Sequence, residues 1–251
     1  MRPYILAETN WYKLKDTQPD LAILPWGATE AHNNHLPYST DNIEADQIIS
    51  RSAGIAYDRG AKLIVLPTIP FGVNTGQADI LLNINLNPST QFSILKDVIQ
   101  VLDRQGIRKF LIFNSHGGNE FKPLLRELGL LYPKMFLGVA DFYKVLDKKD
   151  YFQLDGDHAD EMETSLMLYL RPDLVLDKKH WGKGVERMIN LKYFSENWAW
   201  TERKWSKVTA DTGIGDPQFA TREKGERYFL DLTEKIAEML YELSTTEIGY
   251  A

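Results

Sequence analysis

Short apolar runs alternate with longer amphipathic stretches along this chain, and that alternation restricts the folds it can adopt. Four runs are predicted to be β-strands, at residues 21–24, 62–66, 109–113 and 136–140. They are continuously apolar, which is typical of strands buried on both faces. Apolar spacing predicts helices at residues 41–57, 88–105, 119–131, 160–170 and 216–242. Because strands that alternate with helices form βαβ units, the pattern predicts an α/β fold with a mainly parallel sheet covered by helices.

Residues 181–210 depart from this pattern. The segment has many charged residues and a cluster of aromatic ones, namely Trp181, Tyr193, Phe194, Trp198, Trp200 and Trp205. Aromatic residues are enriched at protein interfaces, so we expect an insertion that serves as an assembly surface in a homo-oligomer. The same residues could instead form a lid over the pocket of a neighbouring subunit. Since the chain has no internal repeat and no linker, one domain is predicted over residues 1–251.

Composition narrows the class of partner. Lys and Arg number 29 and Asp and Glu number 35, and this net charge of −6 argues against a nucleic-acid groove, which needs a clustered basic face. No run approaches the roughly 18 apolar residues of a membrane span, and the first residues lack an apolar signal core. We therefore expect a cytoplasmic protein without a membrane partner. Cysteine is absent, so oxygen and nitrogen atoms must hold any metal.

Carboxylates and histidines are concentrated in three short stretches, at residues 30–41, 114–119 and 158–163. Four of the chain's five histidines lie in them. Carboxylate oxygen and imidazole nitrogen are ligands of zinc, manganese and ferrous iron. The first two stretches directly follow predicted strands, and sites in parallel α/β sheets form beyond the carboxyl ends of strands. If the fold brings the three stretches together, the sequence predicts a metal-dependent enzyme.

The first stretch contains the pair Glu30 and His32, which are two residues apart. Alternate side chains of an extended backbone point the same way, so both could reach one metal cluster. Asp41 lies at a predicted helix start, where a capping role alone would explain it. Because Asp41 occurs in the same stretch as Glu30 and His32, a ligand role for Asp41 is favoured. His35 is predicted to hold Glu30 or His32 in place.

The second stretch places Gly117 and Gly118 directly after His116. The glycines could simply make a tight strand-to-helix turn beside a packed histidine. Such a turn also presents backbone N–H groups to an anion or to a developing oxyanion. The functional interpretation makes His116 a metal ligand and the two glycines the place where substrate binds.

The third stretch places Asp160, Glu161 and Glu163 in the first turns of a helix, where the helix dipole favours negative charge. A structural role would explain any one of them, and only one or two need to face a metal site. His158 directly precedes this group. Asp155, three residues earlier, is predicted to bind substrate.

The motifs taken together resemble the creatininase (creatinine amidohydrolase) family. The resemblance runs in order and at family-like spacing from about residue 20 to about residue 240. It rests on LPWGATEAH (24–32) with HLP (35–37) and TD (40–41), NSHGGN (114–119), HADEMETS (158–165) with RPD (171–173), and GIGDP (213–217) with Ala220 and Lys224-Gly225. One such motif alone is weak, whereas four in order are specific.

The resemblance implies a three-layer α/β/α sandwich with a centre of two divalent metal ions, zinc, manganese or iron. By position, Glu30 and His116 would bind one metal and His32 the other, and Asp41 would bridge both. The family commonly assembles as hexamers, so the resemblance also implies a homohexamer.

Two further roles follow from the resemblance. Gly118 stands where the creatininase itself has a further carboxylate ligand, and we expect Glu163 to take over that role. His158 matches the family's catalytic histidine, and we expect His158 and Glu163 to be the catalytic residues.

The resemblance also implies a reaction class. Leu154 and Gly117 stand where the creatininase has a tryptophan and a tyrosine around its ring-shaped substrate, so creatinine is not the expected substrate. We predict a metal-dependent amidohydrolase that cleaves an amide C–N bond of a small molecule, linear or cyclic, with a metal-activated water. Related family members include a deformylase and a peptidase of cofactor pathways. The alternatives are therefore such an activity on the same scaffold, or a non-catalytic α/β metal-binding module.

Overall fold

The computed structural model describes residues 1–196 and 198–249, and a sheet of four parallel strands lies at its centre. The strands are β1 (Leu21–Trp26), β2 (Leu63–Val65), β3 (Lys109–Asn114) and β4 (Phe136–Asp141). Their order across the sheet is β2-β1-β3-β4, and every neighbouring pair is parallel. The predicted α/β fold with a parallel sheet is confirmed.

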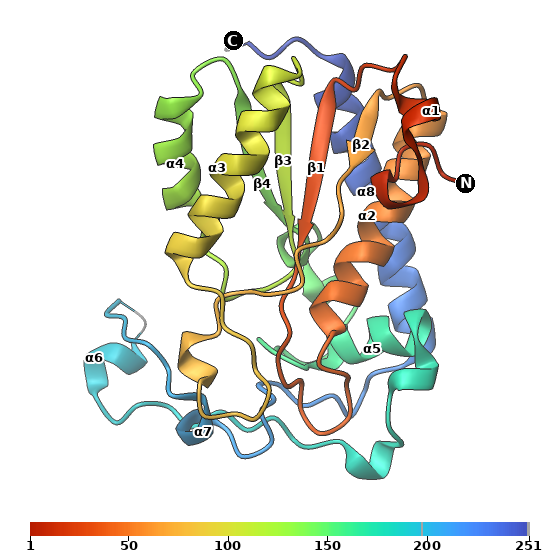
Figure 1. Cartoon of the computed structure of the whole chain (residues 1–251). Helices are drawn as coiled ribbons and strands as arrows, with labels where there is room; N and C mark the ends of the chain where they lie inside the picture. The colour runs from red at the N-terminus through yellow and green to blue at the C-terminus, as the bar shows by residue number, and fades with distance from the viewer. Residues whose placement is uncertain (197, 250–251) are drawn as a thin grey trace.

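Helices follow the strands along the chain and flank the sheet (Figure 1). The α-helices are α1 (Trp11–Leu14), α2 (Thr40–Asp58), α3 (Pro88–Arg104), α4 (Phe121–Leu131), α5 (Glu161–Leu170), α6 (Lys192–Ser195), α7 (Trp205–Val208) and α8 (Arg222–Thr245). Among the described residues, none of these helices combines the length and the apolar character that crossing a membrane requires.

Alternate residues of each strand pack against different helices. Leu21 and Ile23 of β1 belong to a core shared with α2 and α8, whereas Ala22 and Leu24 belong to a core shared with α3 and α4. Burying a leucine or isoleucine fully contributes about 1.5–3 kcal/mol, so both cores stabilise the sheet substantially. Figure 1 shows the two helix pairs on opposite sides of the strands, and the expected three-layer arrangement is confirmed.

The strand order creates a crevice at one end of the sheet. From β1 the chain passes through α2 to β2 on one side, and then through α3 to β3 on the other side of β1. The connections that follow β1 and β3 therefore leave the sheet in opposite directions, which opens a crevice between them. Trp26 at the end of β1 pairs with Asn114 at the end of β3. The two ligand-rich stretches at residues 30–41 and 114–119 thus start side by side.

The first strand extends further than the sequence predicts. It continues through Pro25 to Trp26, although proline lacks the N–H group that a central strand normally uses. The Pro25 carbonyl oxygen accepts a hydrogen bond from Ile69 N (3.0 Å), on the side where β2 has already ended at Val65. Beyond the end of β2 only an isolated parallel bridge between Trp26 and Ile69 remains on that side, and Pro25 takes part through its carbonyl oxygen, so the proline is tolerated.

The last helix begins later than predicted. Asp216 and Pro217 form a turn before it, in which Ala220 N donates to the Pro217 carbonyl (2.8 Å). The helix α8 starts at Arg222, because the Thr221 hydroxyl caps it by accepting from the backbone of the first turn. A capping threonine therefore determines this boundary rather than the proline.

The aromatic segment 181–210 divides into exposed and buried parts. Trp198 (69% exposed) and Trp200 (81% exposed) lie on the surface, next to the short helix α6. Trp205 is only 6% exposed and packs inside the protein at the start of α7. This tryptophan therefore does not belong to the exposed cluster that the sequence predicts.

Close packing of α5 on α8 depends on Gly225. A Cβ atom there would lie 1.9 Å from the Ser165 carbonyl oxygen, which is backbone and cannot move alone. We expect Gly225→Ala to lower the free energy of unfolding by about 1–3 kcal/mol through overpacking. Gly129→Ala in α4 is the control: it has open space around it, and should stabilise by up to about 1 kcal/mol. Denaturant unfolding that ranked the two variants alike would contradict this packing.

Candidate metal centre

Six acid and histidine side chains meet at the carboxyl end of the sheet. They are buried, with at most 8% of any residue exposed, and comprise Glu30, His32, Asp41, His116, His158 and Glu163. The first two follow β1, and His116 follows β3. Asp41 lies in the first turn of α2, whose N-cap is Ser39, so Asp41 is not the capping residue. Glu163 lies in the first turn of α5. The structure thus brings the three stretches together in one place.

Asp41 lies between two groups of potential metal donors. His116 Nδ1 is 3.0 Å from Glu30 Oε1 and 3.1 Å from Asp41 Oδ2. His32 Nε2 is 3.0 Å from Asp41 Oδ1 and 4.0 Å from Glu163 Oε1. The donor atoms of Glu30, Asp41 and His116 lie within 4.8 Å of one another, and so do those of His32, Asp41 and Glu163. One carboxylate therefore offers an oxygen to each group.

His116 and His32 present different ring nitrogens to the centre, Nδ1 and Nε2 respectively, and a backbone carbonyl holds the other nitrogen of each ring. His116 Nε2 lies 3.0 Å from the Val73 carbonyl oxygen, and His32 Nδ1 lies 3.1 Å from the Glu30 carbonyl oxygen. A carbonyl only accepts, so these outer nitrogens donate. In a neutral imidazole the inner nitrogen then carries a lone pair directed at the carboxylates. This is the orientation of a metal-binding histidine whose other nitrogen is held by the backbone.

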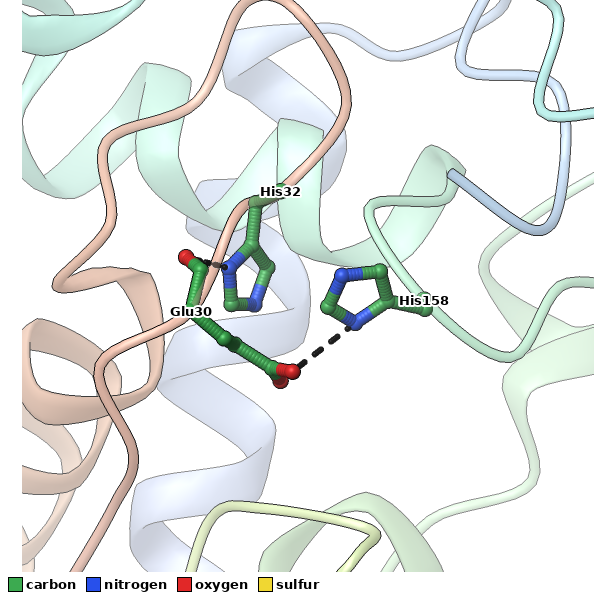
Figure 2. Close-up of side chains that lie close together, drawn as sticks. All are labelled: Glu30, His32 and His158. Carbon is green, nitrogen blue, oxygen red and sulfur yellow. Dashed lines mark hydrogen bonds and ion pairs between the residues drawn. The ribbon is translucent and has the colours of Figure 1, made fainter. Parts of the chain in front are cut away.

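Figure 2 shows His158 beside Glu30 and His32, and its ring is also held by a backbone carbonyl. Its Nε2 donates to the Ala31 carbonyl oxygen (2.8 Å), and its Nδ1 lies 3.6 Å from Glu30 Oε1. The His158 ring is 4.2 Å from the His32 ring, between centroids. Its inner nitrogen therefore faces the candidate centre as well.

Without a metal, protons on two histidines balance the buried carboxylates. Burial lowers the pKa of His32, but the charge and hydrogen bond of Asp41 outweigh it and raise the pKa to about 10. Burial lowers the pKa of His116, but the negative charges of Glu30 and Asp41 outweigh burial. The pKa of His116 therefore lies well above its ordinary value. The pKa of His158 is lowered by burial and by the nearby charge of His32, so this imidazole is neutral.

Two further buried carboxyl groups, those of Glu163 and Glu44, have raised pKa values. Burial, against the charge of His32, raises the pKa of Glu163 to about 8. Glu44, one turn after Asp41, is fully buried, and burial with the charge of Glu163 raises its pKa well above the ordinary value. Such a site favours added positive charge. Its oxygen and nitrogen donors fit divalent ions of the zinc, manganese or iron type.

Gly118 cannot supply a carboxylate in this loop. A Cβ atom there would lie 2.4 Å from the Val73 carbonyl oxygen and 2.5 Å from His116 Nε2. Glu163 instead approaches the centre from α5, with one oxygen toward His32 and the other accepting from Ala159 N. The geometry is thus compatible with Glu163 supplying the carboxylate ligand that Gly118 lacks.

The other acids of the third stretch have structural partners. Asp160 caps α5, because its Oδ1 accepts from Glu163 N (3.1 Å). Glu161 points away from the centre and accepts from the backbone N–H groups of Gln153 and Leu154, both at 2.9 Å. Of the three carboxylates, the structure places Glu163 at the centre.

Two predicted residues lie elsewhere. His35 is buried, but its Nε2 contacts the Thr164 hydroxyl (2.9 Å) and its ring packs on Trp181, rather than on Glu30 or His32. Asp155 is exposed and is not among the described residues that line the pocket beside the centre; Asp157 is.

The pocket beside the centre has a volume of about 150 Å³. Gly117 and Gly118, which are predicted to bind substrate, line it together with residues from other parts of the chain. The described lining residues are Glu30, Val73, Asn74, Gly76, Gln77, His116, Gly117, Gly118, Asp157, His158, Glu202, Arg203 and Trp205.

Sequence reasoning missed several residues that hold the donors. Gln77 donates a hydrogen bond to the Glu30 carboxylate from a short 3-10 helix (Thr75–Gln77) that has no local sequence motif. Asn119 accepts from Val73 N (3.1 Å) and thereby fixes the loop whose carbonyl receives His116. Asn119 belongs to a motif in the sequence and could have been suspected, whereas Gln77 gives no signal.

Comparisons with known proteins identify the family. The creatinine amidohydrolase family profile matches residues 7–240. The chain belongs to the creatininase family. A creatinine amidohydrolase of Pseudomonas putida is 28% identical over 194 residues, covering 68% of this chain and 73% of that protein. A mycofactocin precursor peptide peptidase of Mycolicibacterium smegmatis is 26% identical over 226 residues, covering 88% and 84%.

Solved structures agree with this assignment. The crystal structure of a candidate creatinine amidohydrolase from Bacteroides fragilis NCTC 9343 has a TM-score of 0.93 and 38% identity, covering 100% of both chains. A creatininase mutant complexed with creatine has a TM-score of 0.81 and 22% identity, covering 97% of this chain and 99% of that one. A manganese creatininase scores 0.77 at 21% identity, with coverage of 97% and 99%. The creatininase-like fold is confirmed.

The stability of the metal-free protein should fall as the pH rises from about 6.5 to about 10. Protonated His32 stabilises the fold below the unfolded pKa of histidine, and this contribution is lost as the pH passes its folded pKa of about 10. Glu163 adds to this fall up to about pH 8, because its carboxyl group stays protonated in the folded protein, with a pKa of about 8, while it ionises in the unfolded chain.

Denaturant unfolding in a chelating buffer at several pH values measures this slope. His32→Gln should flatten it, while His180→Gln, at an exposed histidine, should leave it unchanged. Saturating zinc or manganese should also flatten it. A metal-free protein whose stability is constant or rises over this range would contradict the charge balance described above.

Proposed function

We propose that this creatininase-family chain is a metal-dependent amidohydrolase that cleaves an amide C–N bond of a small molecule. The observation that carries this proposal is the pair of donor groups, Glu30–His116 and His32–Glu163, which share Asp41. Two divalent ions held there would polarise an amide carbonyl and lower the pKa of a water molecule to near 7. The donors fit zinc and manganese, and solved creatininases include a Zn–Zn form and a manganese form.

The protein's own groups would complete the reaction. Gly117 and Gly118 line the pocket, and Gly117 has open space around its Cα, so a carbonyl group can approach their backbone there. Neutral His158 directs an unprotonated nitrogen at the centre, which suits it to accept a proton and pass it to the leaving nitrogen. Glu163 is the second predicted catalytic residue; its pKa of about 8 applies to the metal-free protein, so a metal bound there would displace a proton from this carboxyl group.

The pocket supports a small substrate. Its volume of about 150 Å³ lies below the roughly 300–1,000 Å³ of sites for drug-sized ligands. Because two mycobacterial relatives are named as peptide peptidases, peptidase activity is the alternative function. Hydrolysis of small amides rather than peptides would decide between them, and absence of any hydrolysis would favour a metal-binding module.

Purified protein should retain close to two equivalents of zinc or manganese after dialysis and should consume a component of a mixture of small linear and cyclic amides. A chelator should abolish this hydrolysis, and added metal should restore it. His158→Ala should keep both metals but lower kcat by at least about 10²-fold, the lower bound for general acid–base catalysis. Metal-independent hydrolysis, or an unchanged kcat in His158→Ala, would contradict the proposal.

We also propose that the exposed aromatic residues of segment 181–210 mediate self-association into a homo-oligomer, a hexamer by family resemblance. Tyr193, Trp198 and Trp200 are 55%, 69% and 81% exposed, and large exposed aromatic groups favour burial in an interface. Sedimentation velocity should show an oligomer at micromolar concentration, and Trp200→Ala should shift it toward smaller species. A wild-type monomer would refute this interface. The cytoplasmic location stays a prediction.

A further inference from the structure

The pocket beside the candidate metal centre is closed partly by a segment far from the metal donors in sequence. Glu202, Arg203 and Trp205 line it together with His116, His158 and the glycines at 117 and 118. We call residues 202–206 the wall segment. It belongs to the aromatic stretch that sequence patterns assign to assembly, yet part of it contributes to the pocket.

The wall segment is held tightly against a loop on the other side of the pocket. Thr75 donates from its hydroxyl to Glu202 Oε2 (3.0 Å). A Cβ atom on Gly76 would lie 2.2 Å from the Arg203 carbonyl oxygen and 2.6 Å from Glu202 Oε1. Only a glycine permits this approach, so the sequence of the loop keeps the wall segment close. The position of the wall is thus determined by packing of backbone on backbone.

Trp205 is fixed within the wall on several sides. Its Nε1 donates to the Thr212 carbonyl oxygen (2.9 Å), and its ring meets the His158 ring edge to face at 5.5 Å and 90°. The Arg203 guanidinium lies 4.7 Å from the Trp205 ring centroid and pairs with Asp157 at 2.9 Å. With its N–H bonded and its ring packed against two side chains, the indole is a rigid boundary of the pocket.

We propose that Trp205 is a specificity-determining residue that sets the upper size of the substrate. The indole restricts the site to compact amides and excludes substrates with bulky groups next to the scissile carbonyl, including peptide chains. This inference rests on the proposed function, since it names the class of substrate that the same centre accepts. It predicts that removing the indole, or displacing the wall segment, enlarges the range of accepted ligands.

Hydroxamates test this without knowledge of the natural substrate, because they chelate divalent ions through two oxygen atoms. Titration calorimetry on the zinc-loaded full chain would compare acetohydroxamate with diphenylacetohydroxamate. The wild type should bind the small probe at least about tenfold more tightly than the bulky one. Trp205→Ala should lower the Kd of the bulky probe about tenfold and change the Kd of acetohydroxamate by less than about threefold.

Two further variants keep the test informative. Gly76→Ala displaces the wall segment and leaves the Trp205 side chain in place, so it should also strengthen binding of the bulky probe. It replaces Trp205→Ala in the test if that variant folds poorly. Trp11→Ala, at a tryptophan that is 78% exposed on α1, should leave the ratio of affinities unchanged.

A zinc-loaded wild type that binds both hydroxamates alike would overturn the size limit alone. So would an unchanged ratio of affinities in both Trp205→Ala and Gly76→Ala. A protein that retains no zinc and binds neither hydroxamate would instead overturn the proposed function, and this inference with it.

Discussion

The site depends on a concentration of negative charge that the fold removes from water. Glu30, Asp41 and Glu163 are buried, with donor atoms of Asp41 within 4.8 Å of both Glu30 and Glu163, and each buried carboxylate costs several kcal/mol unless positive charge balances it. Protonated His32 and His116 provide part of that balance in the metal-free protein. Backbone carbonyls nevertheless hold both imidazoles in the orientation that a neutral metal ligand needs. Metal binding would therefore replace protons by cations without moving the side chains, and would release those protons to solvent.

The fold gives this cluster its rigidity. Opposite crossovers after β1 and β3 open the crevice, and the paired strand ends place the Glu30 and His116 loops side by side. The first turn of α2 brings Asp41 between them, with the Ser115 hydroxyl donating to the Asp41 carbonyl oxygen (2.8 Å). Each donor thus comes from the end of a regular element or from a loop bonded to one. Such support is what a preorganised metal site requires.

The strands, most helices and the three donor-rich stretches could be predicted from the sequence, because they depend on local periodicity and short spacing. Contacts between distant segments could not. The carbonyl of Val73, the amide of Gln77 and the indole of Trp205 reach the site only through tertiary packing. Trp205 also shows that aromatic content alone does not separate an assembly surface from a pocket wall. His35 is near the donors in sequence, but its ring packs on Trp181 and its Nε2 contacts the Thr164 hydroxyl, which are both contacts with distant segments.

The most direct test of the central claim is a crystal structure of the zinc-loaded protein with anomalous scattering recorded at the zinc edge. The account predicts two anomalous peaks about 3.5–4 Å apart, the spacing of paired catalytic metals. One peak should lie among Glu30, Asp41 and His116, and the other among His32, Asp41 and Glu163, with Asp41 contacting both. A single peak, or peaks that leave Asp41 without a metal contact, would contradict the account.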